Sequence, residues 1–135
     1  MLVISILEAE DFGDELYSIM RETLTGLIKV RHAGLIIASG DSKGMIHRLF
    51  TELAIEYPSV FFTILLSNDK LAYTGGYKEW PQIYSLDCNI AYGAQESAKQ
   101  RRRKMLIERS DIIICRKMYC DDIRQTNLDC EIIVF

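Results

Sequence analysis

The sequence of 135 residues has only two prolines, one tryptophan and two histidines, and it lacks any long apolar segment. No apolar run approaches the roughly 20 residues that a membrane-spanning helix needs. A secretory signal peptide is not predicted, because residues 1–7 have no basic region before them and run directly into Glu8, Glu10 and Asp11. We therefore expect a cytoplasmic protein that does not bind membranes.

The balance of apolar and charged residues excludes several protein classes. Hydrophobic residues make up 49% of the chain and charged residues 26%, with a formal net charge of −3. Intrinsic disorder needs low hydrophobicity and high net charge, so a folded chain is expected. A dedicated nucleic-acid-binding protein usually has a strong basic excess, so nucleic acid is not an expected partner. The length predicts a single domain over residues 1–135.

The cysteines and histidines do not form a metal-binding pattern. The cysteines are Cys88, Cys115, Cys120 and Cys130. No two of them are spaced CxxC, and both histidines, His32 and His47, lie far upstream. We expect neither a metal nor a cofactor, and thiols in a cytoplasmic chain are expected to stay reduced.

The first half of the chain alternates apolar runs with amphipathic segments. The apolar runs, predicted to be buried strands, are Leu2–Leu7, Gly34–Ala38 and Val60–Leu66. Apolar residues recur every three or four positions between them, which predicts two helices. Asp11 is the predicted N-cap of the first helix, and Tyr57-Pro58 is predicted to end the second.

The second half continues this alternation after an irregular segment, residues 67–93, for which no regular element is predicted. A third helix is predicted over Gln95–Arg109, a fourth strand over Ile112–Cys115 and a fifth over Glu131–Phe135, while residues 117–129 fit either a short helix or a loop. Strands that are apolar on both faces and alternate with helices indicate a parallel sheet covered on both sides. The expected fold is α/β: a Rossmann-like three-layer domain with a mostly parallel five-stranded sheet.

A small polar turn follows the second predicted strand. It consists of Ser39, Gly40, Asp41, Ser42, Lys43 and Gly44. Open parallel sheets bind ligands beyond the carboxyl ends of their strands, and the free amides of a following helix favour a phosphate or carboxylate. The turn is therefore a candidate anion site, although a plain connection with Ser39 or Asp41 as N-cap fits the same residues.

Two further segments carry candidate site residues. The third predicted helix is strongly basic, and its Arg103 and Arg109 either contact phosphate groups or belong to a solvated face. Glu8 follows the first strand, where a carboxylate can bind a sugar hydroxyl, act as a general base or cap the next helix. No Ser/His/Asp or Cys/His arrangement is recognisable, so no catalytic residue is assigned.

Two stretches together carry a family resemblance. Leu35–Leu66 reads as a strand, a glycine-containing turn, an amphipathic helix ending at Tyr-Pro and a strand, and Arg103–Ile113 has the sequence RKMLIERSDII. Their order and spacing resemble the SLOG superfamily of Rossmann-like proteins, which includes the YpsA-type proteins and the lysine-decarboxylase-like cytokinin-activating enzymes. The resemblance implies a nucleotide-type ligand at Ser39–Gly44.

The sequence also departs from this family's pattern. Asp41 replaces the middle glycine of the turn, and Ile46 replaces the acidic residue that follows its second glycine. The Gly-x-Arg turn after the first strand is missing. The segment P-G-G-x-G-T-x-x-E, which carries catalysis in the phosphoribohydrolase branch, has no counterpart after the fourth strand. The chain thus resembles a shortened, divergent member, and the resemblance does not imply hydrolysis.

The preferred prediction is a domain that binds a nucleotide or a nucleotide-derived small molecule. The turn residues Ser39, Gly40, Ser42 and Gly44 would donate hydrogen bonds, Lys43 with Arg103 or Arg109 would neutralise phosphate, and Glu8 or Asp41 would contact a sugar hydroxyl. One alternative is a phosphoribohydrolase-like enzyme that cleaves an N-glycosidic bond with Glu8. Another is a non-catalytic interaction module, such as a homodimer that pairs through the edge strand Glu131–Phe135.

Overall fold

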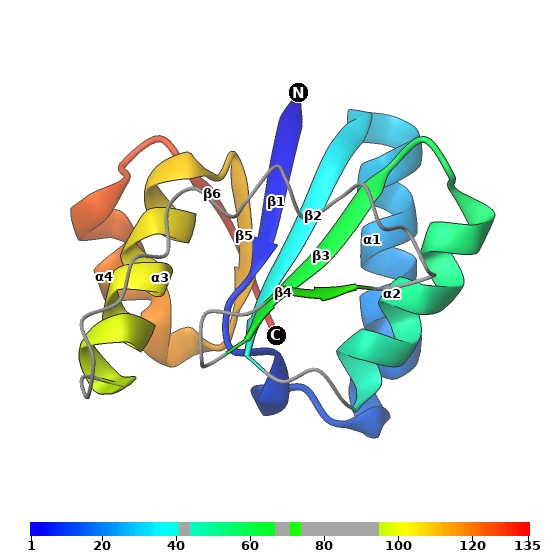
Figure 1. The fold of residues 1–135 in the computed structure, drawn as a ribbon. Helices are drawn as coiled ribbons and strands as arrows, with labels where there is room; N and C mark the ends of the chain where they lie inside the picture. The colour runs from blue at the N-terminus through cyan, green and yellow to red at the C-terminus, as the bar shows by residue number, and fades with distance from the viewer. Residues whose placement is uncertain (41–43, 67–70, 74–94) are drawn as a thin grey trace.

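A computed structural model describes residues 1–40, 44–66, 71–73 and 95–135. Their strands form a six-stranded sheet of order β4-β3-β2-β1-β5-β6 (Figure 1). The strands are β1 Leu2–Ile6, β2 Ala33–Gly40, β3 Phe61–Leu66, β4 Leu71–Tyr73, β5 Ile112–Cys115 and β6 Glu131–Val134. All neighbouring strands are parallel except β4, which pairs antiparallel with β3 at one edge.

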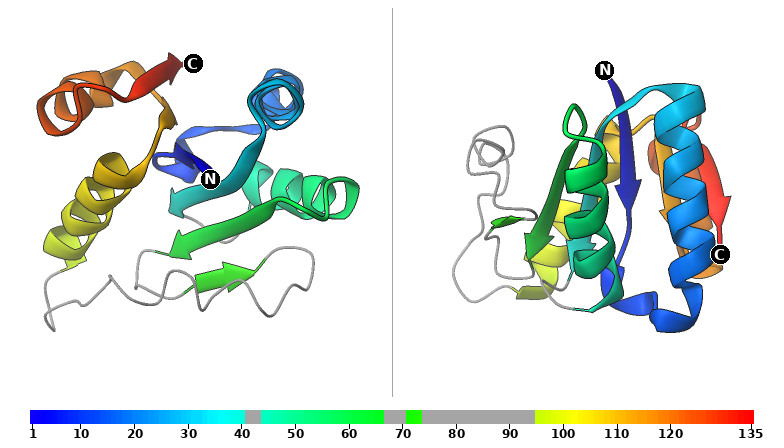
Figure 2. Two further views of the ribbon diagram at one scale, coloured as in Figure 1. Left: turned by 90° about the horizontal axis from the view of Figure 1, so that it is seen from above. Right: turned by 90° about the vertical axis from the view of Figure 1, so that its right-hand side faces the viewer.

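Helices cover both faces of the sheet, which confirms the predicted three-layer Rossmann-like fold. The helices are α1 Tyr17–Arg31, α2 Met45–Glu56, α3 Gln95–Arg109 and α4 Cys120–Thr126. Seen from above in Figure 2, α1 and α2 lie on one side of the sheet and α3 and α4 on the other. Within the described residues no helix is long and apolar enough to cross a membrane.

Alternate side chains of the central strands enter two separate cores. In β5, Ile112 and Ile114 pack in the core beneath α1 and α2, whereas Ile113 and Cys115 pack in the core beneath α3 and α4. All four are fully buried. This two-sided burial explains why the strands appear in the sequence as continuous apolar runs rather than as alternating patterns.

The predicted start of the first helix is wrong. The Asp11 side chain forms no capping hydrogen bond with a helix backbone. Asp11 is instead the last residue of a short 3-10 helix, Ala9–Asp11, and a second 3-10 helix, Asp14–Leu16, precedes α1. The cause is Phe12, which is only 2% exposed and packs edge-on against Phe135, with ring centroids 5.9 Å apart. Its backbone is extended, so burial of this ring interrupts the helix that the acidic residues would otherwise begin.

Two segments without a single predicted element, residues 117–129 and 67–93, contain regular secondary structure. Residues 117–129 contain a 3-10 helix, Lys117–Tyr119, followed by α4, so the helical alternative holds. The irregular segment 67–93 contributes the unpredicted strand β4, and its other residues lie outside the described ones.

Candidate functional site

The carboxyl ends of β1, β2 and β5 lie at one edge of the sheet, the lower edge in Figure 1. The chain leaves β1 through α1 to reach β2 on one side, while β5 flanks β1 on the other. The sheet therefore has its topological switch point between β1 and β5, which is where open α/β sheets bind ligands. The residues that follow these two strands form the candidate site.

Glu8, just after β1, forms an ion pair with Arg103 of α3. Glu8 is 7% exposed, and its Oε1 accepts hydrogen bonds from Nε of Arg103 at 3.3 Å and from Nη2 at 3.1 Å. The guanidinium lies 4.8 Å from the centre of the Tyr119 ring, and the Tyr119 hydroxyl donates to Asp11 at 3.4 Å. One chain of contacts thus joins the ends of β1 and β5 to α3.

The backbone of Glu8 is held in an unusual conformation. Its φ of 57° and ψ of 72° are left-handed, a region that costs a residue with a Cβ roughly 1–2 kcal/mol. The Glu8 N–H donates to Oγ of the buried Ser39 at 3.0 Å. Because Ser39 lies near the end of β2, this bond ties the ends of β1 and β2 together.

The charges around Arg103 are predominantly acidic. Partial burial raises the pKa of Glu10, and a hydrogen bond with Glu8 and the charges of Glu8 and Asp11 raise it further. Desolvation, followed by the charges of Asp11 and Glu8, raises the pKa of Tyr119 to about 12, so its phenol stays neutral and donates at neutral pH. Since Glu8 already neutralises Arg103, these carboxylates favour hydroxyl donors over a further anion.

A second part of the same edge favours an anion. Helix α2 begins after Gly44, which has a φ of 93°, and no side chain among the described residues caps its first turn. The amides of that turn and the helix dipole attract negative charge. The sequence-predicted residues Asp41, Ser42 and Lys43, which precede Gly44, lie outside the described residues.

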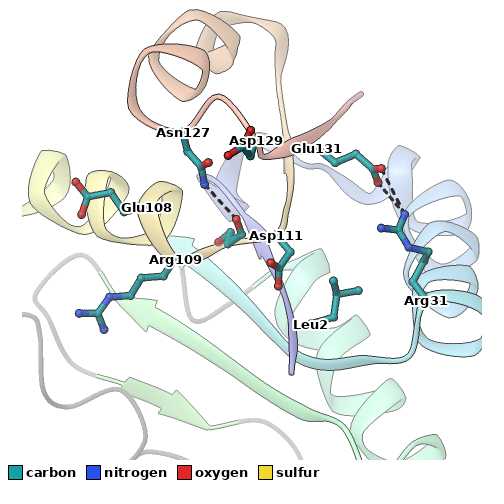
Figure 3. A pocket seen from close by; sticks show the side chains of 9 residues that line it. Leu2, Arg31, Glu108, Arg109, Asp111, Asn127, Asp129 and Glu131 are labelled. Atoms are coloured by element: carbon teal, nitrogen blue, oxygen red, sulfur yellow. Dashed lines mark hydrogen bonds and ion pairs between the residues drawn. The ribbon is translucent and has the colours of Figure 1, made fainter.

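The structure brings together some of the predicted site residues and separates one. Glu8, Ser39 and Arg103 are linked by the contacts above, with Gly40 ending β2 and Gly44 preceding α2. Arg109 lies at the opposite edge, where it lines an open pocket of about 420 Å³ (Figure 3). Glu10 belongs to the acidic group that the sequence places after the first strand. Tyr119 was not predicted, although its position shortly after a strand end is a usable signal.

The pocket beside Arg109 is formed by the amino ends of β1, β5 and β6. Its polar groups already have structural roles: Arg31 pairs with Glu131 at 3.1 Å, and Asp111 accepts the Val3 N–H at 2.8 Å. Asn127 donates to the carbonyls of Ile107 and Ser110. Figure 3 shows the Arg109 side chain pointing away from Asp111 and Asn127, so these polar side chains do not converge on one position where a ligand could bind.

Comparison with protein-family models, curated proteins and solved structures finds no match to this chain. The resemblance to the SLOG superfamily therefore stays a prediction. Among the described side chains, no group of three or more His, Cys, Asp or Glu residues is arranged to hold a metal ion.

Proposed function

We propose that the protein binds a nucleotide or a nucleotide-derived ligand across the carboxyl ends of β1 and β2. The sugar hydroxyls donate to the carboxylates of Glu8, Glu10 and Asp11, and the phosphate accepts from the first-turn amides of α2. Arg103 is neutralised by Glu8, so it positions that carboxylate instead of binding the phosphate. A cytoplasmic setting, in which the free thiols stay reduced, belongs to this proposal.

The observation that carries the proposal is the hydrogen bond from the Glu8 N–H to Ser39 Oγ. It fixes Glu8, and with it the neighbouring carboxylates of Glu10 and Asp11, beside the end of β2, so one edge of the sheet offers acceptors for hydroxyls and, at the start of α2, amide donors for an anion. A ribose joined to a phosphate presents these two chemistries side by side. The left-handed backbone of Glu8 supports the same interpretation, since such strain is concentrated at functional sites.

Calorimetric titration tests this proposal with the four nucleoside monophosphates, their nucleosides, ribose 5-phosphate and inorganic phosphate. At least one nucleotide is expected to bind, and to bind more tightly than its nucleoside. Glu10→Gln should weaken that binding about tenfold, because it weakens a charged hydrogen bond to a sugar hydroxyl. Glu108→Gln, an exposed carboxylate of α3, is the matched control. The absence of heat with every compound at millimolar protein rejects the proposal.

A second candidate function is hydrolysis of an N-glycosidic bond, and the Glu8–Glu10 pair favours it. Glu8 is a buried carboxylate paired with a guanidinium, whereas burial and the nearby charges of Glu8 and Asp11 raise the pKa of Glu10. Carboxyl groups whose environments differ in this way suit the separate roles of charge stabilisation and proton donation. The base would leave with a proton from Glu10, water would add to the sugar C1 as the C1–N bond breaks, and the proton that the water loses would return to Glu10.

Chromatography of nucleoside monophosphates incubated with the protein tests the second candidate. Release of the free base by the wild type, and its loss in Glu8→Gln with an unchanged circular dichroism spectrum, would support hydrolysis. No base release by the wild type, or full activity in the folded Glu8→Gln protein, rejects hydrolysis and leaves binding to be judged by calorimetry.

A further inference from the structure

One flank of α1 exposes apolar and small residues along its whole length. Ile19, Thr23, Gly26 and Val30 follow one another at intervals of four, three and four residues, so they form a single line on the helix. Ile19 is 53% exposed and Val30 is 75% exposed. A Cβ added to Gly26 would meet no atom within 4 Å, so the middle of this line is open to a close approach.

This line faces away from the neighbouring helix α2. Contacts between α1 and α2 run through Tyr17 and Arg21, which bond to Glu52. Arg21 is two residues from both Ile19 and Thr23, or about 200° around the helix. The line therefore lies on the flank of α1 opposite α2. Seen from above in Figure 2, α2 lies toward the β3 end of the sheet and α1 toward the end where β6 is the last strand.

The edge of β6 adds to the same side. No described strand pairs with its outer edge, and Ile133 in it packs against the core beneath α1 and α2 while staying only partly buried. An open edge presents unpaired backbone donors and acceptors, which proteins usually cover or pair. Its neighbour along the chain, Phe135, is held in the core by Phe12, so the strand is fixed in place.

The α1 line is complementary to itself in an antiparallel arrangement. If two copies of α1 cross about a two-fold axis near the middle of the line, Ile19 meets Val30 of the second copy, and Thr23 meets Gly26 of the second copy. Each contact occurs twice by symmetry, as in an isologous interface. The large residues then cover the ends, and the small residues let the backbones come close in the middle.

The charges beside the line also match only in this arrangement. Glu22 and Lys29 are exposed next to the line, and neither forms an ion pair within the described part of the chain. Antiparallel packing places Glu22 near Lys29 of the second copy, twice. Parallel packing would instead place Glu22 near Glu22 of the second copy and Lys29 near Lys29 of the second copy, and these like charges would repel each other.

We propose that this surface, the Ile19–Val30 line of α1 with the adjoining edge of β6, is a homodimer interface with antiparallel α1 helices. The proposal does not depend on what the carboxyl edge of the sheet binds. It commits to a second copy of this chain because the shape and the charges of the line complement themselves.

Sedimentation equilibrium from 1 to 200 µM tests the proposal. The wild type is expected to dimerise, and Gly26→Leu should abolish the dimer while the circular dichroism spectrum stays unchanged, since the new side chain enters open space in the monomer. Glu22→Lys and Lys29→Glu should each weaken the dimer about fivefold, and the double variant should restore it. Glu108→Lys on α3 is the control for a charge change elsewhere.

Two outcomes would overturn the proposal. One is a wild type that stays monomeric at 200 µM. The other is a dimer that tolerates Gly26→Leu, or whose charge-reversal variants are not rescued in combination. That second outcome would assign the dimer to another surface.

Discussion

Glu8 combines, at the end of β1, two features that each lower the stability of the folded protein. Its backbone is left-handed, and its carboxylate is buried against the guanidinium of Arg103. Removing one partner of such a pair leaves the other charge without compensation. The hydrogen bond from its N–H to Ser39 supplies part of what keeps the backbone in place.

The strain at Glu8 can be measured by comparing two substitutions. Glu8→Gly and Glu8→Ala both remove the carboxylate, but only glycine adopts a positive φ without steric cost. We expect both variants to be less stable than the wild type, with Glu8→Gly about 1 kcal/mol more stable than Glu8→Ala. Urea unfolding followed by circular dichroism measures the difference.

His32 provides the control for this comparison. It has the same φ of 57°, ends α1 and is exposed, so its substitution disturbs no buried charge. His32→Gly should likewise exceed His32→Ala by about 1 kcal/mol in free energy of unfolding. If Glu8→Gly and Glu8→Ala unfold at the same urea concentration while the His32 pair differs, the backbone at Glu8 is not strained.

At the scale of elements, helices α1 and α2 are joined by a polar network. The Tyr17 hydroxyl donates to Glu52, Arg21 bonds to Glu52 at 3.2 Å and to Glu56 at 2.6 Å, and Arg48 lies over the Tyr17 ring at 4.7 Å. The bond to Glu52 is the main cause that raises the pKa of Tyr17. The ion pairs are partly exposed, so each contributes little by itself.

A double-mutant cycle on Tyr17→Phe and Glu52→Gln isolates the bond between the two helices. We expect a coupling free energy of about 1 kcal/mol, because a hydrogen bond to a charged acceptor is stronger than a neutral one. Chemical unfolding of the four proteins gives this value. No hydrogen bond or ion pair among the described residues joins Tyr57 to Glu52, so a cycle with Tyr57→Phe should be additive. Equal coupling in both cycles would contradict the assignment.

The elements themselves were largely predictable from the sequence, because most of their signals are local. The limits of α3 follow from its composition and from Ser110-Asp111, and the buried strands follow from their apolar runs. The start of α1 was not predictable, because it depends on packing of Phe12 against Phe135, at the far end of the chain. β4 was missed because its three residues are too few to form a pattern.

The candidate site was predictable as a location but not as a set of contacts. The strand order makes the ends of β1 and β2 neighbours, so Glu8 and Ser39 could be assigned to one edge. The pairing of Glu8 with Arg103 joins residues 95 positions apart, which no local pattern encodes. Arg103 and Arg109 differ by about 9 Å along α3, enough to place them at opposite edges of the sheet.

At the scale of the whole molecule, the core beneath α3 and α4 holds protons that the unfolded chain would release. Burial raises the pKa of the Cys115 thiol to about 12 and of the Cys130 thiol to about 11, and desolvation raises that of Tyr119 to about 12. In the unfolded chain, thiols lose their protons near pH 8.5 and phenols near pH 10. At a pH between a group's pKa in the unfolded chain and its higher pKa in the folded protein, the folded state binds more protons than the unfolded state. The free energy of unfolding must therefore fall as the pH rises.

Cys115 is the most informative of these groups, because it is fully buried. Between about pH 9.5 and 11.5 its thiol is protonated in the folded state and ionised in the unfolded one, which lowers stability by about 1.4 kcal/mol per pH unit. Cys115→Val, which removes the ionisable thiol, should therefore reduce the alkaline slope of the unfolding free energy by about that amount. Guanidinium unfolding at intervals from pH 8 to 11, with reductant, measures the slope, and each variant is compared with its own value at pH 8. The exposed Lys117→Ala variant should keep the wild-type slope. Equal slopes for Cys115→Val and the wild type would show that the Cys115 thiol has its ordinary pKa in the folded protein.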